Sequence, residues 1–164
     1  MKLEVGKGIY AYVEQLENLE FTAGPMIGKA IYAGAKIVAD EISRNIDAIP
    51  TDDRPYVEEG VKRTGLKSIQ KAALKASFGI APEQNQNGYI NVKLGFDGYN
   101  QLKSKKYPKG QPNAMIARTI ESGNSFTQKH PFIAPAVRWT KASAELEMQK
   151  VIDTELYKKI SQGG

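Results

Sequence analysis

The sequence predicts an α+β fold in which an antiparallel β-sheet packs with a long helix from the N-terminal half and a long C-terminal helix. Apolar residues recur at three- and four-residue spacing over residues 27–46 and again over residues 135–160, which indicates two amphipathic helices. Apolar residues alternate with others over residues 90–96, as in a strand with one buried face. We expect these elements to form a single domain over residues 1–164.

Composition excludes several classes of protein and site. The chain is 41% hydrophobic and 25% charged, as in ordinary globular proteins. It contains no cysteine, which excludes a disulfide framework, a cysteine-ligated zinc site and a thiol nucleophile and favours folding inside a cell. No secretory signal is visible at the start. No apolar run approaches the ~20 residues that a membrane span needs, so we expect no membrane partner.

The first third is predicted to be helical. A short amphipathic helix is expected from Ile9 to Leu19, and residues 22–25 end it. The long helix follows, with Pro25 near its start. Its apolar stripe consists of Ile27, Ile31, Val38, Ile42 and Ile46, with Ala35 filling the gap. On the opposite face, Asp40 and Arg44 have the i,i+4 spacing of an ion pair.

The middle of the chain is predicted to mix one helix with a hairpin. Thr64 is a plausible N-cap for a helix through Ser77. Residues 78–80 are expected to be extended and to pair with the strand over residues 90–96. Between them, Asn87-Gly88 is typical of a hairpin turn.

The last third is predicted to hold two helices. Asn113 can cap a short helix over residues 114–121, for which a strand is the alternative, and Gly123 is expected to end it in the αL conformation. The core side of the final helix is expected to comprise Val137, Ala144, Met148, Val151 and Leu156. Trp139 is either an interface anchor or a residue in the core or at its edge.

The residue types of enzyme active sites do not gather in this sequence. His130 is the sole histidine, and as a general base or metal ligand it would need companions that the surrounding sequence does not offer. The carboxylate pairs at residues 40–41, 52–53 and 58–59 are adjacent in sequence and indicate solvated surface. We therefore expect no enzymatic activity, no metal and no cofactor, and a small hydrolase using His130 is a remote alternative.

A lysine-rich loop carries the most concentrated charge. The net charge is +5, and four lysines stand around one tyrosine in this loop: Lys103, Lys105, Lys106, Tyr107 and Lys109. Such a loop could grip a phosphate backbone without reading base sequence, or it could simply keep the protein soluble. A polar, mobile loop is expected over residues 51–60, and it would offer an acidic surface to neighbouring subunits.

A series of short motifs occurs in a fixed order along the chain. They are TGLKSI at residues 64–69, SFGI at 77–80, GFDGY at 95–99, KYPKG at 106–110, ARTIESGNSF at 117–126 and HPFIAPA at 130–136. In their order and spacing they resemble the gene-product-ten-like family of long-tailed phages and prophages, whose members are minor virion proteins at the head–tail junction. The resemblance covers nearly the whole chain.

The resemblance implies a neck or tail-completion adaptor without a catalytic centre. It implies a homo-oligomeric ring around the DNA passage, with phage connector or head-completion proteins and tail proteins as partners. The resemblance also implies that the protein is located in the virion, at the head–tail junction, and in the host cytoplasm during assembly. The family's Glu-x-Gly stop and Pro-Phe-x-x-Pro-Ala turn match a set of hinge candidates: Glu121, Gly123, Pro131, Phe132 and Pro135.

The function therefore has two candidates from different classes. The first is the structural adaptor, in which the two prolines fix the entry into the last helix because each locks its φ and removes an amide donor. The second is a basic nucleic-acid-binding accessory protein, in which the lysine loop is the working surface and makes non-specific contact with genomic DNA.

Overall fold

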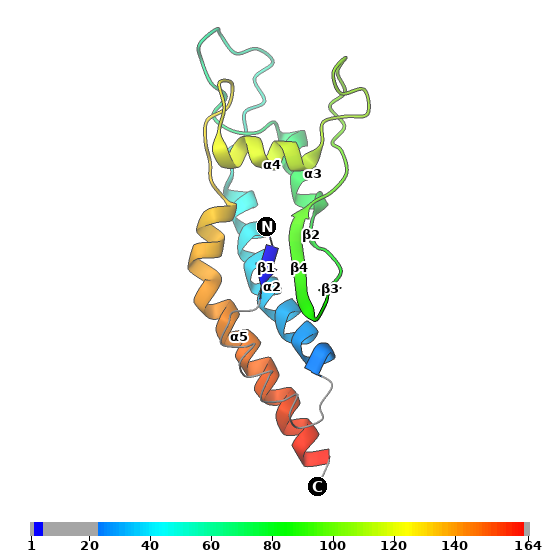
Figure 1. The fold of residues 1–164 in the computed structure, drawn as a ribbon. Coiled ribbons are helices and arrows are strands. Elements are labelled where there is room, and N and C mark those ends of the chain that lie inside the picture. Colours follow the sequence, from blue (N-terminus) through cyan, green and yellow to red (C-terminus); the bar gives the residue numbers. More distant parts are fainter. Residues whose placement is uncertain (1, 5–22, 163–164) are drawn as a thin grey trace. The chain divides into compact units, whose positions relative to one another are not determined.

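The computed structural model describes residues 2–4 and 23–162, and their fold is α+β (Figure 1). The chain forms two compact units, each built from segments distant in sequence. Among the described residues, the first comprises residues 2–4, 23–39, 80–94 and 139–162, and the second comprises residues 40–79 and 95–138. The helix predicted from Ile9 to Leu19 lies outside the described residues. No described helix is both long and apolar enough to cross a membrane.

Within the first unit, residues 23–39 of helix α2 (Ala23–Ala48) pack closely against residues 139–162 of helix α5 (Ile133–Gln162). A Cβ added to Gly34 would lie 2.2 Å from the Met148 Cε atom and 3.2 Å from the Ala144 carbonyl oxygen, so the two helix backbones approach each other there. At the rim, Lys29 Nζ lies 3.2 Å from Glu155 Oε2 and lowers the pKa of the Glu155 carboxyl. The five predicted apolar residues of α2 are all buried.

The sheet contains four described strands, one of which, β4, is central. They are β1 (Lys2–Glu4), β2 (Phe78–Ile80), β3 (Gln84–Gln86) and β4 (Tyr89–Phe96). Strand β4 lies between β1 and β2 and also pairs with β3. Hydrogen bonds from Asp97 N to Ser77 O and from Ala81 N to Lys93 O flank β2 and confirm its predicted antiparallel pairing with β4. Asn87 and Gly88 have φ values of 56° and 86°, which confirms the hairpin turn.

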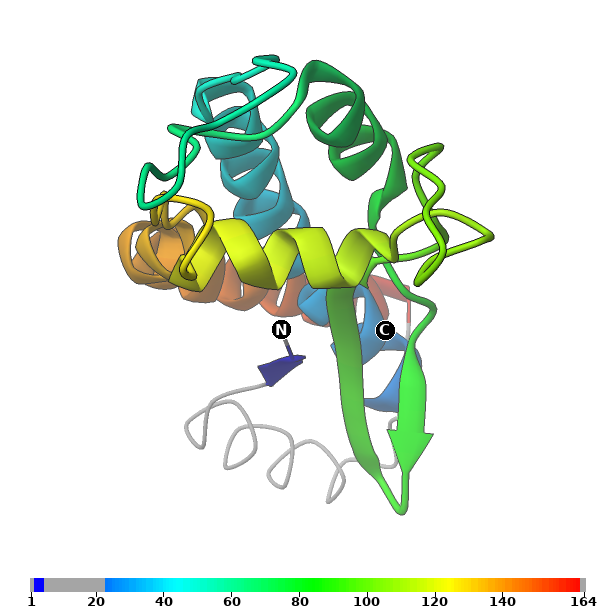
Figure 2. The same cartoon turned by 90° about the horizontal axis from the view of Figure 1, so that it is seen from above.

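In the second unit, helices α3 (Ser68–Ser77) and α4 (Asn113–Ser122) pack against each other, as Figure 2 shows from above. The largest buried side chains of this unit are Ile42, Ile46, Leu74, Ile120 and Phe132. Residues 113–122 form a helix, so the strand alternative is wrong.

Three predicted local contacts are wrong. Helix α3 starts at Ser68 instead of Thr64, since Asp53 accepts hydrogen bonds from the Ser68 amide and hydroxyl. Arg44 pairs with Glu41 at i,i+3, and not with the predicted Asp40. The Asn113 side chain does not cap α4.

Asn113 has a different role at that helix start. Its Nδ2 donates a 2.9 Å hydrogen bond to the carbonyl oxygen of Asp97, and the side chain is buried. This bond ties the first residue of α4 to the segment that leaves strand β4.

Candidate functional site

Helix α4 ends at a glycine that no other residue could replace without strain. Gly123 has φ 71° and ψ 168°, and its amide donates a 2.8 Å hydrogen bond to Thr119 O. The positive φ agrees with the prediction, but this ψ is far from the αL value and belongs to a region that essentially only glycine adopts. A Cβ there would lie 3.0 Å from the Lys129 Cβ atom.

The Glu121 carboxylate caps the start of helix α5. Its Oε2 accepts hydrogen bonds from the backbone amides of Phe132 at 2.7 Å and Ile133 at 2.9 Å, and its Oε1 accepts one from Ala134 at 2.9 Å. The first amides of a helix have no partner within it, and a carboxylate there also meets the positive end of the helix dipole. Glu121 thus fastens the end of α4 to the first turn of α5.

Phe132 secures the same connection by packing. It is fully buried, and its ring lies edge-on to Phe96 with 6.0 Å between centroids. Its carbonyl oxygen accepts a 3.0 Å hydrogen bond from Asn45 Nδ2. Pro131 just before it is exposed, whereas Pro135 is half-buried in the first turn of α5. The structure therefore brings the five hinge candidates together in one connection, hereafter the α4–α5 joint (residues 121–135).

His130 belongs to this joint as a structural residue. Its Nε2 lies 2.6 Å from the Thr64 carbonyl oxygen, and its amide donates to Ile120 O. Nearby, Arg63 N donates to Phe126 O and Gln128 N donates to Arg63 O. These bonds join the loop before α3 to the joint. Among residues 2–4 and 23–162, no group of three or more His, Asp or Glu side chains could hold a metal ion.

The predicted acidic loop is anchored at its start by a buried carboxylate. Asp52 is buried, and its oxygens accept hydrogen bonds from the Arg54 guanidinium at 2.5 and 2.8 Å and from the Thr64 amide at 2.9 Å. The Arg54 guanidinium, more than the Thr64 amide, holds the pKa of the Asp52 carboxyl well below its usual range despite burial. Asp52 is therefore part of the framework and offers no acidic surface to a partner.

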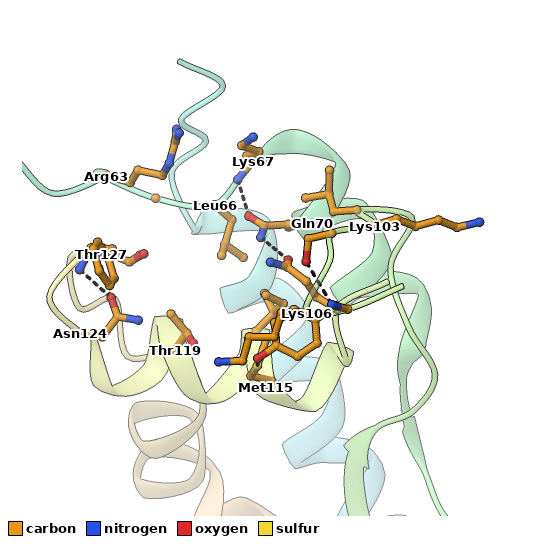
Figure 3. Close-up of a pocket in the computed structure, with 17 residues that line it drawn as sticks. Arg63, Leu66, Lys67, Gln70, Lys103, Lys106, Met115, Thr119, Asn124 and Thr127 are labelled. Atoms are coloured by element: carbon orange, nitrogen blue, oxygen red, sulfur yellow. Dashed lines mark hydrogen bonds between the residues drawn. The ribbon is translucent and has the colours of Figure 1, made fainter. Parts of the chain in front are cut away.

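A pocket of about 610 Å³ lies in the second unit beside the lysine loop (Figure 3). Of the described residues that line it, the charged ones are all basic: Arg63, Lys67, Lys103 and Lys106. Leu102, Met115, Ile116 and Phe126 contribute apolar surface, and Gln70, Gln111, Thr119 and Asn124 contribute polar groups. The lining suits an anion that also has an apolar part.

The predicted lysine-loop residues divide between this pocket and the outer surface. Lys103, Lys106 and Tyr107 line the pocket, although the Lys103 side chain extends away from it in Figure 3. Lys106 Nζ lies 5.5 Å from the centre of the Tyr107 ring, whose hydroxyl donates to Met115 Sδ at 3.2 Å. Lys105 and Lys109 are exposed and do not line it.

Asn100 holds the base of the lysine loop in place. Its side-chain oxygen accepts hydrogen bonds from the amides of Leu102 at 2.9 Å and Gln111 at 3.2 Å. Gly110 has φ 99°, and a Cβ on it would lie 1.8 Å from the Asn100 carbonyl oxygen. The two ends of the lysine loop are thus held together at Asn100.

The outer face of helix α5 is a further candidate that the sequence reading missed except at one position. Four large apolar side chains there are exposed: Trp139 at 73%, Leu146 at 72%, Tyr157 at 75% and Ile160 at 65%. At about 100° per residue, they fall within about 60° of one another around the helix. The opposite face holds the buried residues Ala144, Met148, Ile152 and Leu156. We call the exposed row the outer face of α5.

The spacing of these four side chains in the sequence already indicates that they share one side of the helix. Intervals of 7, 11 and 3 residues separate these four side chains, and each interval returns close to the same side of a helix. Their presence shows that α5 is apolar on two sides. Trp139 is exposed, so its predicted place in or at the edge of the core is wrong, and its role as an interface anchor stays a prediction.

No protein-family model, curated protein or solved structure matches this chain.

Proposed function

We propose that this chain is a non-catalytic structural protein of a phage or prophage virion, acting at the head–tail junction as a neck or tail-completion adaptor. The outer face of α5 carries this proposal. Single exposed apolar residues are common on protein surfaces, but a row of four along one helix is typical of a surface that a partner covers.

The outer face suits a protein that works by docking. Trp and Tyr are enriched among the residues that contribute most to binding free energy, and the row contains Trp139 and Tyr157. Because Met148 and its neighbours on the inner side already pack in the fold, a partner can cover the outer side without disturbing the core.

The α4–α5 joint supports the same proposal. The first turn of the docking helix is held in place, because Glu121 accepts hydrogen bonds from three amides there and Phe132 is buried. The order of sequence motifs supplies the virion setting. The partners we propose are neighbouring copies in a ring, connector or head-completion proteins, and tail proteins.

Disruption of the coding sequence in a phage or prophage that carries it tests this function. Electron microscopy of the lysate should show DNA-filled heads and complete tails that are not joined, and supplying the intact chain should restore tailed particles. Tailed particles at the undisrupted level would contradict the proposal.

A second candidate is a nucleic-acid-binding accessory protein, favoured by the all-basic charged lining of the pocket. Binding of a DNA duplex should then weaken steeply with salt, and Lys103→Glu with Lys106→Glu should reduce both the affinity and the salt dependence. Exchange of Lys62 and Lys93, exposed lysines that do not line the pocket, provides the matched control. Binding that is insensitive to salt would remove this candidate.

A further inference from the structure

We propose that a second copy of this chain covers the outer face of α5 in solution, packed antiparallel about a two-fold axis. The proposal rests on the docking role of that face. Its basis is the order of exposed side chains along the helix, which is Leu146, Lys150, Asp153 and Tyr157. The order is apolar, basic, acidic, apolar, and the intervals of 4, 3 and 4 residues are symmetric about the midpoint between residues 151 and 152.

An antiparallel pair centred on that midpoint brings unlike groups together. Leu146 then meets the partner's Tyr157, and Lys150 meets the partner's Asp153. The two-fold axis repeats both contacts, so the interface contains two apolar pairs and two ion pairs. Asp153 accepts a 3.1 Å hydrogen bond from Gln149 in its own helix, and an ionised carboxylate has room to accept from an ammonium group as well.

The same row opposes a parallel arrangement. Two parallel copies in register would place Lys150 beside the partner's Lys150 and Asp153 beside the partner's Asp153. Like charges directly opposite each other are destabilising. The charge order therefore selects the antiparallel direction.

The end of the row fits the same register. Ile160 falls opposite the partner's Ala142 and Ser143, and these small residues leave space for its side chain. The paired segment runs from residue 143 to residue 160, about 27 Å of helix. Trp139 lies about one helical turn beyond it.

Two-fold pairing closes on itself and leaves no free edge from which a chain of copies could grow. A pair of this kind would keep Leu146 and Tyr157 covered until a head or tail protein displaces the second copy. Trp139 would remain accessible as the first contact for that partner.

Cysteine cross-linking tests the direction and register, because the chain has no cysteine of its own. Leu146→Cys and Tyr157→Cys, made as separate variants and mixed, should form a covalent dimer with a short thiol-reactive cross-linker. Leu146→Cys alone should not, since its two copies would lie about 16 Å apart along the axis. The matched control is a mixture of Glu145→Cys and Lys158→Cys, which have the same register but lie off the row and should not cross-link.

Sedimentation measures the strength of the pair. Lys150→Glu should raise the dimer dissociation constant about tenfold or more, because the two-fold axis places the substitution in both Lys150–Asp153 contacts. Adding Asp153→Lys should restore dimerisation, since the exchanged charges again attract. Trp139→Ser should leave the dissociation constant unchanged. These residues are exposed, so thermal melts of the variants should match the wild type.

Three outcomes would overturn the pairing: a monomer at every concentration, efficient cross-linking of Leu146→Cys with itself, or no rescue by the charge exchange. A monomer whose Leu146→Lys variant also fails to join heads to tails would leave the docking role of α5 standing and reject only the second copy. Cross-linking as predicted, together with normal joining of heads and tails after loss of the coding sequence, would support the second copy and reject the proposed head–tail function.

Discussion

The Glu121 carboxylate accepts a 2.7 Å hydrogen bond from the backbone amide of Phe132, across eleven residues of chain. The same carboxylate holds the next two amides, while the Phe132 ring is buried against Phe96. One side chain of α4 thus satisfies the free amides at the start of α5. The α4–α5 joint is capped and packed, and this is why a loop of mostly polar residues can hold a helix of 30 residues at its first turn.

Replacing Glu121 with alanine should lower the free energy of unfolding by about 2 kcal/mol, because three amides lose a charged acceptor at a helix N-terminus. Glu121→Gln keeps one oxygen acceptor and should cost about half as much. Urea denaturation measures both. Glu145→Ala, an exposed site in the same α5 helix, is the control and should stay within about 0.5 kcal/mol of the wild type.

Gly123→Ala should destabilise the protein by about 2–4 kcal/mol. The backbone there has a positive φ that alanine rarely adopts, and the new Cβ would meet Lys129 at 3.0 Å. Gly79→Ala is the matched control, since its φ is not positive and no atom lies within 4 Å of the added Cβ. Equal urea midpoints for the two variants would show that Gly123 is not strained in this way.

Phe132→Ala should cost about 3–5 kcal/mol, as expected when a large aromatic side chain leaves a packed core. The double variant Pro131→Ala and Pro135→Ala should cost only about 1–2 kcal/mol, mainly through the greater freedom of its unfolded chain. The comparison separates packing from proline stiffness at the joint. A larger loss in the proline variant would assign the stability of the joint to the prolines.

Asp52 should make the stability depend on pH in acid. The Arg54 guanidinium keeps the pKa of this carboxyl below its unfolded value of about 3.9. Its contribution is therefore complete above the unfolded pKa and is lost as the pH falls through the folded one. The Tm of Asp52→Asn should lie below that of the wild type at pH 7, and the gap should narrow towards pH 3. Arg54→Ala should show a similar narrowing, and a constant gap in both variants would contradict the account.

The regular elements could be predicted because their signals are local. The stripe from Ile27 to Ile46 matches the helical period and is buried. The alternation through Val92 and Leu94 matches the strand period except at Asn91, which the alternation places on the other face and which is buried. The turn at Asn87-Gly88 needs only its own two residues. In each case the hydrophobic period or the turn chemistry decides the structure without reference to distant parts of the chain.

Contacts that depend on the folded arrangement could not be predicted in the same way. Thr64 looked like a helix cap, but Asp53 reaches Ser68 from fifteen residues away. The Glu-x-Gly pattern identified Glu121 by resemblance, whereas its three amide partners follow only from the fold. The outer face of α5 does not follow from a single buried stripe, because Leu146 and Tyr157 lie on the side of the helix away from that stripe.

The central claim is that the outer face of α5 is the working surface of a head–tail adaptor. The most direct measurement is the fraction of joined particles, counted by electron microscopy, when variants are supplied to a phage or prophage that lacks the intact chain. Leu146→Lys combined with Tyr157→Lys should leave heads and tails unjoined, whereas Lys103→Glu combined with Lys106→Glu should restore joining. Full restoration by the α5 variant would contradict the account.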